Sequence, residues 1–530
     1  MNKKVLIALV CVIIVAAGYF IFGQQQPAAE KSADSSSEYK DTLTFATNTD
    51  IITLDPQIQN DTTTEQIVRM LYNNLLKFDD EGNIVGDLAE EWGPSEDGLT
   101  WTIKLKQGVK FHNGKEMTAA DVKATFERAM QAKAGGLRTT EIIKMFRSIA
   151  APDKYTVTIT TDKPYGPMEA LLCNLSLAVM DSEFIDKYGL DLGSKTEAEN
   201  GTGPYKIASW TKDDEVVIER FGDYFDGPAF TQKIVVKPIP EAASRVIALE
   251  NGEVDVISNI SANDLATLEG HEGIKVMKVP TISQRLFRFG CNDPIITNTK
   301  VRQAIVHAID RQAIIDSLFA GTAYPSTAPL APVTWGYTNL GEIKRDMEKS
   351  KQLLKEAGYP NGFETKIVTC ERYMKGTQMA EVIASQLAEV GIKAKIEVWE
   401  WSALSASWDG VKKEDFDQPI FVMGAGPSMR DADGGLRGLY TTAETGLNDR
   451  NYGFYSNTEA DRLIYAGMSE TDKEKRAKLY ADAEKILYLD DPAAFWLFDM
   501  YGMCAMSDKV EGVKVSPINN VTFERARVRN

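Results

Sequence analysis

The sequence predicts a mixed α/β protein that is divided into more than one lobe. The chain has 530 residues, which is more than a single hydrophobic core usually organises. Short segments with the period-two pattern of strands alternate along it with segments that carry the apolar stripe of helices. No repeat of about 20–50 residues is visible in the sequence, which excludes solenoids and propellers.

Strand candidates recur along the whole chain. The clearest are 99–106 and 155–160, in which apolar and polar side chains alternate, as expected for a strand with one buried face. The strand candidates, in order, are 43–47, 99–106, 155–160, 215–219, 233–237, 254–257 and 393–398.

Helix candidates lie between these strands. Thr118, with Asp121 three residues later, resembles a capping box and predicts the start of one helix. Apolar residues at helical spacing predict a single helix over 300–320, with Gly321 in the position that follows the last turn. The helix candidates, in order, are 62–76, 120–130, 242–250, 300–320, 349–357 and 378–390.

Charge and motif content exclude several classes of function. The chain has 59 Lys and Arg against 76 Asp and Glu, a net charge of −17, whereas nucleic acids and anionic membranes require a basic face. With three histidines and no cysteine pair at metal-ligand spacing, we expect neither a metal site nor a cofactor. The sequence has no G-x-S-x-G elbow, Walker A loop or H-E-x-x-H motif, so we expect no catalytic residues and no enzyme.

The N-terminus predicts an export signal. Two lysines precede an uninterrupted apolar stretch over Val5–Phe22, which is long enough to span a bilayer as a helix. We expect 1–23 to be an uncleaved membrane anchor, with signal cleavage as the second alternative and lipidation of Cys11 as the third. All three place the body outside the cytoplasm, at the cell surface or in the periplasm, and make 24–40 a flexible tether.

Six segments, in one order, carry a resemblance to a known family. They are LAEEWGPSEDGLTWTIKLKQGVKFHNGKEMTAADVKATFER (88–128), GTGPYKIASW (201–210), NTKVRQAIVHAIDRQAII (298–315), DMEKSKQLLKEAGYPNGFE (346–364), MAEVIASQLAEVGIKAKIEVWEW (379–401) and YSNTEADRLI (455–464). From about residue 43 to 515 the chain is similar to the extracellular solute-binding proteins of the dipeptide, oligopeptide and nickel type (family 5), which serve ABC importers.

The resemblance implies an α/β fold of the periplasmic-binding-protein type (type II, cluster C), with three domains in two lobes and the ligand cleft between the lobes. Domain I would be discontinuous, over 41–77, 200–289 and 500–530. Domain II would cover 78–199, and domain III would cover 290–499. Closure of the lobes around a solute would let the transporter distinguish the loaded form from the empty one.

The resemblance also implies a function and partners. The protein would capture short peptides or peptide-like solutes as a monomer and deliver them to an ABC permease and, through it, to ATPase subunits. An oligosaccharide-binding member, favoured by the tryptophans within 399–408, and a peptide-signal receptor are the alternatives; no histidine falls in a cleft-matching segment, which disfavours nickel. Cys291 and Cys504 would lie on adjacent connections between domains, and a disulfide between them would require Cα atoms within roughly 7 Å.

Several residues match ligand-binding positions of the family. Arg372 is similar to the arginine that holds the peptide carboxylate in dipeptide-binding relatives, although a solvated loop arginine is the alternative. Trp401 aligns with a tryptophan of the relatives' cleft, with core packing as the competing role. The weaker candidates are Thr49, Asp50 and Arg138.

The segment 421–440 departs from the dipeptide-binding pattern. Where those relatives carry an aspartate for the ligand's ammonium group, this chain has Pro427 or Ser428. Asp431 and Asp433 are the nearby anions, and their DADGGLRGLY context is closer to glutathione-importing members. Recognition of a simple α-amine is therefore in doubt, and the two aspartates are the candidates for it.

Overall fold

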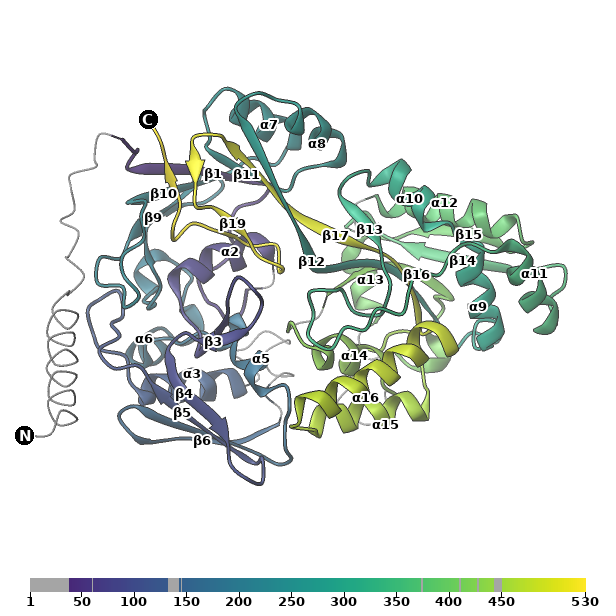
Figure 1. Ribbon diagram of the computed structural model, residues 1–530, viewed down its shortest axis with the longest axis horizontal. Helices are drawn as coiled ribbons and strands as arrows, with labels where there is room; N and C mark the ends of the chain where they lie inside the picture. Colours follow the sequence, from purple (N-terminus) through teal and green to yellow (C-terminus); the bar gives the residue numbers. More distant parts are fainter. Residues whose placement is uncertain are drawn as a thin grey trace, which may run out of the picture.

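The fold consists of two lobes joined by two long antiparallel strands (Figure 1). The computed structural model describes residues 38–59, 61–131, 143, 145–372, 375–408, 411–426, 429–442 and 450–530. Within these ranges no helix is both long and apolar enough to cross a membrane, and the predicted anchor over 1–23 lies outside them. Of the tether expected over 24–40, Tyr39 bridges to Arg529 and the Lys40 backbone N–H donates to the carbonyl of Val528 at 2.8 Å, whereas 24–37 lie outside the described residues.

One layer of the first lobe is the sheet β11-β1-β10-β9-β8. In it, β1 (Thr42–Thr47) runs parallel to both β10 (Lys233–Pro238) and β11 (Val256–Ser258), and its residues Leu43 and Phe45 belong to the same apolar core as the C-terminal hairpins. The other elements are α2 (Thr62–Leu71), β8 (Tyr205–Thr211), β9 (Glu215–Arg220), α7 (Ala242–Glu250), α8 (Ala262–Glu269), β18 (Val510–Glu511), β19 (Lys514–Val515), β20 (Val521–Thr522) and β21 (Arg527–Val528).

The rest of the first lobe surrounds a four-stranded antiparallel sheet in the order β4-β5-β7-β6, with its own apolar core. Helix α3 starts as expected, since the Thr118 backbone N–H donates to the Asp121 carboxylate at 2.9 Å and completes the capping box. The elements are β2 (Leu76–Phe78), β3 (Ile84–Gly86), β4 (Ala89–Pro94), β5 (Thr100–Leu105), α3 (Ala119–Met130), β6 (Phe146–Asp153), β7 (Thr156–Thr161), α5 (Met168–Leu172) and α6 (Ser182–Tyr188).

The second lobe is a mixed sheet, β15-β14-β16, extended by the second-lobe ends of the crossing strands and covered by helices. Two apolar clusters fill the space on either side of it. The elements are α9 (Thr299–Ala308), α10 (Arg311–Leu318), β13 (Ala323–Pro325), α11 (Met347–Glu356), β14 (Glu364–Thr369), α12 (Gly376–Ala388), β15 (Lys393–Val398), α13 (Trp401–Ala406), β16 (Ile420–Ala425), α14 (Ala432–Tyr440), α15 (Thr458–Ser469) and α16 (Lys473–Lys485).

The single helix predicted over 300–320 is wrong, because the structure has two helices there. Helix α9 ends at Ala308, and Asp310 caps α10 by accepting the backbone N–H of Ala313 at 3.0 Å. The N-cap carboxylate stops the first helix although the apolar stripe continues through the break. Gly321 does adopt the left-handed conformation, with φ at 75°.

The crossing strands are β12 (Ile274–Phe289) and β17 (Ala494–Ser507), which pair along most of their length. The ladder is interrupted in the middle, where Pro280 pairs with Tyr501 but the next pair is Gln284 with Asp499. Three residues of β12 therefore face one residue of β17. An irregularity of this kind weakens the ladder locally and allows the strands to bend, so we identify it as the hinge between the lobes.

The expected proximity of Cys291 and Cys504 is wrong. Cys504 pairs with Met277 in the first lobe, whereas Cys291 follows the other end of β12 and contacts the second-lobe core. Met277 and Cys291 are 14 positions apart along the chain, which corresponds to about 46 Å of extended strand. The two connections do run side by side, but these cysteines lie at opposite ends of them and form no disulfide.

Candidate functional site

The candidate site lies where the carboxyl ends of two sets of parallel strands face each other. In the first lobe β1 and β11 end at Thr47 and Ser258. In the second lobe β14 is parallel to β15 and to β16 and ends at Thr369. In open α/β sheets, ligands bind outside the carboxyl ends of the strands, so the loops that follow these strands are the expected ligand contacts.

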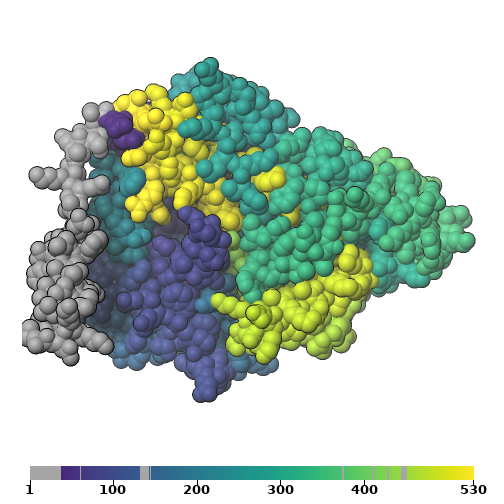
Figure 2. Space-filling model, viewed as in Figure 1, coloured from purple at the N-terminus to yellow at the C-terminus, as the bar shows by residue number. Residues whose placement is uncertain are grey.

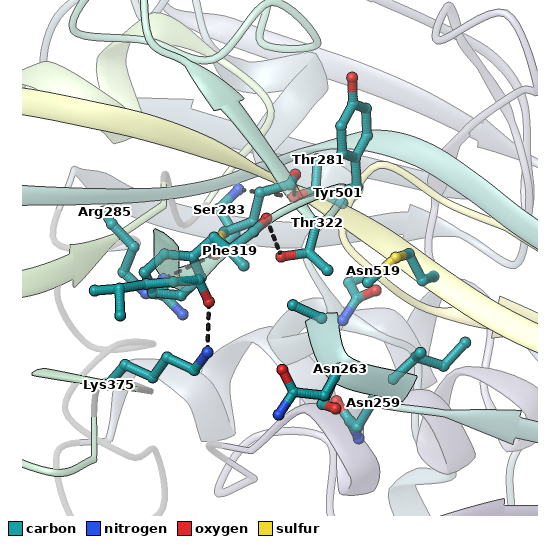
Figure 3. A pocket seen from close by; sticks show the side chains of 16 residues that line it. Asn259, Asn263, Thr281, Ser283, Arg285, Phe319, Thr322, Lys375, Tyr501 and Asn519 are labelled. Carbon is teal, nitrogen blue, oxygen red and sulfur yellow. Dashed lines mark hydrogen bonds between the residues drawn. The ribbon is translucent and has the colours of Figure 1, made fainter. Parts of the chain in front are cut away.

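A cavity of about 170 Å³ occupies this position (Figure 3). Its walls come from the loop after β11 and the start of α8 in the first lobe, from the hinge in β12 and β17, and from the second lobe around α10 and α12. The polar and charged side chains that line it are Asn259, Ser261, Asn263, Thr281, Ser283, Arg285, Thr322, Lys375, Tyr501 and Asn519.

The two cations of this cavity have defined surroundings. The Lys375 ammonium group donates to the carbonyl of Leu318 at 2.5 Å and lies 5.7 Å from the ring centre of Phe319. Arg285 extends from β12 just beyond the hinge, and its Nη1 donates to Ser283 Oγ at 3.3 Å. Both side chains are partly buried and line the cavity.

Thr49 and Asp50 are not among the residues that line the cavity. Asp50 Oδ2 accepts the indole N–H of Trp210 at 3.1 Å and the backbone N–H of Asp213 at 2.9 Å. These bonds fix the loop after β1. The preceding residue, Asn48, accepts from the side chain of Asn259 at 2.6 Å, so the loop supports the cavity wall from behind.

The structure brings Arg372 and Trp401 together. The Arg372 guanidinium lies 4.4 Å from the ring centre of Trp401, in a cation–π contact at the carboxyl ends of β14 and β15. Trp401 also packs edge-on against Trp408, with ring centres 5.9 Å apart. Arg372 is exposed and neither residue lines the cavity, although Lys375 follows Arg372 on the same loop.

Asp431 and Asp433 are buried and are paired with arginines of their own lobe. Asp431 accepts two hydrogen bonds from Arg476, at 2.8 and 2.5 Å, and caps α14 through the backbone N–H of Asp433 at 2.9 Å. Asp433 accepts two from Arg437, both at 2.8 Å. Each carboxylate is thus neutralised inside the protein. Arg138 lies outside the described residues.

The lobes also touch on the side of the cleft away from the hinge. The Tyr165 hydroxyl of the first lobe donates to the carboxylate of Asp433 at 3.2 Å, and Lys473 of the second lobe pairs with Glu169 at 2.9 Å. In Figure 2 the two surfaces meet below the crossing strands, with the purple N-terminal segments against the yellow-green α15 and α16. Closure of the cleft requires contact of this kind between the lobes, because it encloses a solute from a second side.

Asp499 is a buried acid at the hinge itself. Its Oδ1 accepts from the side-chain amide of Gln284 at 2.7 Å and from the hydroxyl of Ser326 at 2.6 Å. Burial raises the pKa of Asp499 from 3.8 to about 6, against these two hydrogen bonds, which lower it. The protonation of this carboxyl group is therefore coupled to the packing of the hinge.

Sequence reasoning missed the cavity residues Arg285, Lys375 and Asn259. They are far apart along the chain, and none belongs to a motif. One signal was available for Asn259, which lies two residues after the strand candidate 254–257, and Lys375 lies three residues after the candidate Arg372.

Residues 83–446 match the sequence profile described as "Bacterial extracellular solute-binding proteins, family 5 Middle". The chain belongs to this family. Family 5 consists of solute-binding proteins, not enzymes, so the cleft is a binding site and not a catalytic centre. The resemblance given by the six sequence segments is thereby confirmed, as is the two-lobed α/β fold class.

Similar family members cover nearly the whole chain. The glutathione-binding protein GsiB of Escherichia coli O1:K1 is 30% identical over 485 residues, which are 91% of this chain and 94% of that protein. The ABC transporter-associated periplasmic binding protein DppA of Helicobacter pylori, solved with the peptide STSA, is 29% identical with a TM-score of 0.77, over 92% of this chain and 99% of that one. HbpA2 of Haemophilus parasuis is 27% identical with a TM-score of 0.82, over 92% of this chain and 99% of HbpA2.

Proposed function

We propose that this family member captures a short peptide or peptide-like solute in the cleft between its lobes and delivers it to an ABC permease. The observation that carries the proposal is the cavity at the carboxyl ends of the strands, which takes its walls from both lobes and from the hinge. A solute there contacts every part that moves during closure, so its binding energy favours the closed form.

The similar proteins support the peptide-like ligand. One is named for glutathione, which is a peptide, and another was solved with the four-residue peptide STSA. Both cover the present chain over more than nine-tenths of its length.

The proposal includes the oligomeric state, the partners, the location and the ligand-binding domains of the protein. The protein acts as a monomer and engages ATPase subunits only through the permease. Its body, held outside the cytoplasm, is tethered by the apolar stretch over Val5–Phe22 or released by signal cleavage. Domain I, over 41–77, 200–289 and 500–530, receives the solute together with domain III, over 290–499.

Within the cleft, Arg372 holds the free carboxylate of the solute. Its contact with Trp401 orients the guanidinium at the carboxyl ends of β14 and β15 and leaves that group exposed to an approaching anion. A planar guanidinium can donate two parallel hydrogen bonds to a carboxylate, which favours this geometry over a lysine.

Melting-temperature shifts test the proposal. Peptides of two to five residues, glutathione, cello-oligosaccharides and nickel chelates are compared at equal concentration. A ligand at a hundred times its dissociation constant stabilises the protein by about 2.7 kcal/mol, and we expect this only from peptides or glutathione. If only sugars or chelates raise the melting temperature, the peptide-like ligand is wrong.

A further inference from the structure

The hinge carries a buried acid at the break in its ladder. The last pair on the first-lobe side of the break is Pro280 with Tyr501, and the first pair beyond it is Gln284 with Asp499. Asp499 is 0% exposed, and the next residue of the strand, Met500, lines the cavity between the lobes. A movement of the lobes about this break therefore changes the surroundings of the Asp499 carboxyl group.

Only one oxygen of this carboxyl group is hydrogen-bonded among the described residues. Asp499 Oδ1 accepts from the Gln284 amide at 2.7 Å and from the Ser326 hydroxyl at 2.6 Å, whereas Oδ2 is buried and has no partner in this part of the chain. Tyr324 pairs with Asp499 between β13 and β17, and its buried hydroxyl has no partner within the described ranges either. A negative charge on a carboxyl group that lacks donors at one oxygen is costly to bury.

Arg311 of α10 is the cation that acts on this carboxyl group, and among the described residues it makes no hydrogen bond to it. Its Nη1 donates to the carbonyls of Ser326 and Trp496 at 2.6 and 3.0 Å, and its Nη2 donates to the carbonyl of Ile343 at 3.0 Å. Burial therefore dominates. It raises the pKa of Asp499 from 3.8 to about 6, against the two hydrogen bonds at Oδ1 and the charge of Arg311.

The other groups around Asp499 have been considered as rival sites of protonation. Burial raises the pKa values of Tyr324, Tyr337 and Tyr488, so these phenols stay neutral between about pH 5 and 8. Burial also raises the pKa of Glu484, a second buried acid, which experiments must separate from Asp499. The titratable or charged side chains on the surrounding elements are Arg285 on β12, Arg311 on α10, Tyr324 on β13, Tyr501 on β17, Tyr337 and Glu342 in the loop before α11, Glu484 on α16 and Tyr488 after it.

The two protonation states of Asp499 favour different positions of the hinge. In the structure the carboxyl group is excluded from solvent while the lobes touch through Tyr165 and Asp433. Opening at the ladder break lets water reach the group, and hydration stabilises its charged form far more than its neutral form. The neutral carboxyl group therefore favours closure, and the carboxylate favours opening.

We infer that the hinge is a proton-coupled switch, in which closure of the lobes takes up a proton at Asp499. Mild acid then favours the closed form and tighter retention of the solute, whereas a rise in pH above about 6 favours opening and release. The inference goes beyond the proposed function, because it concerns the hinge and holds for any solute that the closed lobes enclose.

A zero-length cross-linker measures closure without any solute. A carbodiimide joins the Lys473 ammonium group to the Glu169 carboxylate, which are 2.9 Å apart across the two lobes. The pair Lys123 and Glu127, also 2.9 Å apart but within α3, corrects for the pH dependence of the reagent. In the solute-free protein, the ratio of the first cross-link to the second should be higher at about pH 5.5 than at about pH 7.5, by up to about fourfold. An equal ratio at both pH values, counted by mass spectrometry, would overturn the inference.

Calorimetry tests the same coupling during binding. Tri-alanine and glutathione carry no group with an ordinary pKa between about 5 and 7, so a proton taken up near pH 6 belongs to the protein. Titrations in phosphate and in Bis-Tris, which differ in ionisation enthalpy, should give an uptake of up to about 0.5 proton at about pH 6. The affinity should fall by up to about tenfold between about pH 5 and pH 7. Binding with no proton uptake and no dependence on pH would contradict the switch.

Substitutions assign the proton to one residue. Asp499→Asn keeps an oxygen for Gln284 and Ser326 but cannot become charged, so it should abolish both the proton uptake and the pH dependence of the cross-link ratio. Glu484→Gln is the matched control, because it neutralises a buried acid on α16, and it should leave both effects unchanged. Persistence of the effects in Asp499→Asn, or their loss in Glu484→Gln, would assign the proton elsewhere and overturn the inference.

A third variant keeps the inference testable if Asp499→Asn does not fold. Ser326→Ala removes a hydrogen bond that lowers the pKa of Asp499, so the midpoint of the pH dependence should move to higher pH, and an unmoved midpoint would overturn the switch. The two proposals also fail separately. If neither tri-alanine nor glutathione binds at any pH, the proposed function is wrong, while the cross-link ratio of the solute-free protein still decides the inference about the hinge.

Discussion

Removal of the Asp431 carboxylate should destabilise the second lobe without weakening the binding of the solute. Asp431 is 3% exposed and accepts two hydrogen bonds from Arg476, whose side chain is 5% exposed. Asp431→Ala strands this guanidinium in the core, which costs about 3–5 kcal/mol, and removes the cap of α14, which costs about 1 kcal/mol more. The expected total is about 4–6 kcal/mol.

Urea denaturation followed by tryptophan fluorescence measures this loss. Trp335 is a suitable reporter, because the Arg476 guanidinium lies 4.3 Å from its ring centre. Glu459→Ala is the control: Glu459 belongs to an exposed pair with Arg462, and its removal should cost less than about 1 kcal/mol. Adding Arg476→Met to Asp431→Ala removes the stranded charge and should restore part of the stability.

Calorimetry on the folded Asp431→Ala variant completes the test. Because Asp431 does not line the cavity, the dissociation constant of a bound peptide should stay within a few-fold of the unaltered value. A variant with unchanged stability and a large loss of affinity would refute the reasoning. It would show that Asp431 holds the ammonium group of the ligand, as the sequence alone allowed.

Four further predictions follow from the hinge, the closed interface, the cysteines and the loop after β14. The raised pKa of Asp499, about 6, means that the folded state binds this proton more tightly. The contribution of this carboxyl group to the free energy of unfolding is therefore full below about pH 4 and falls by about 3 kcal/mol as the pH rises to above 6. Asp499→Asn should remove this fall, as measured by urea denaturation at several pH values. A variant with the same pH dependence as the unaltered protein would contradict this prediction. Tyr165→Phe deletes a hydrogen bond of the closed form and should weaken solute binding about fivefold in calorimetry, whereas unchanged affinity would show that this contact does not support closure. Cys291 and Cys504 should both be alkylated after unfolding without reductant, as detected by peptide mass spectrometry. Unfolding is needed because burial raises their thiol pKa values to about 11 and about 12, and reductant is not needed because no disulfide joins them. Alkylation only after reduction would refute this prediction. Arg372→Ala should weaken a free-carboxylate peptide by about 2–5 kcal/mol in calorimetry and its C-terminal amide by little, while equal losses would mean that Arg372 shapes the loop without contacting the carboxylate.

The local elements of the fold could be predicted where one signal dominates. Helix α7 begins and ends as expected, at Ala242 and Glu250, and the capping box places the start of α3 correctly. The break at Asp310 was missed because the apolar stripe of the predicted helix continues through it. Burial against the core of the lobe determines which positions are apolar, whereas the N-cap carboxylate of Asp310 determines where one helix ends and the next begins. At this residue the apolar pattern predicts a continuous helix and the N-cap predicts a break.

The site could be predicted only in part, because its members come together through the topology. Arg372 and Trp401 were identified only through the family resemblance, and the structure brings them into contact. Arg285 and Lys375 line one cavity because β12, the end of α10 and the residue before α12 converge, and no pattern in the sequence records that convergence. Likewise, Asp431 and Arg476 are 45 positions apart in the sequence, so their pairing could not be predicted. Asp431 was therefore interpreted as a ligand-binding anion, whereas the structure shows it in a buried ion pair.

The central claim is that the cleft encloses a short peptide or a peptide-like solute. Mass spectrometry of the solute that remains bound after gentle purification from the native host tests it most directly. We predict a short peptide or a glutathione-like molecule, at close to one per protein. A sugar or a metal chelate in its place would contradict the claim.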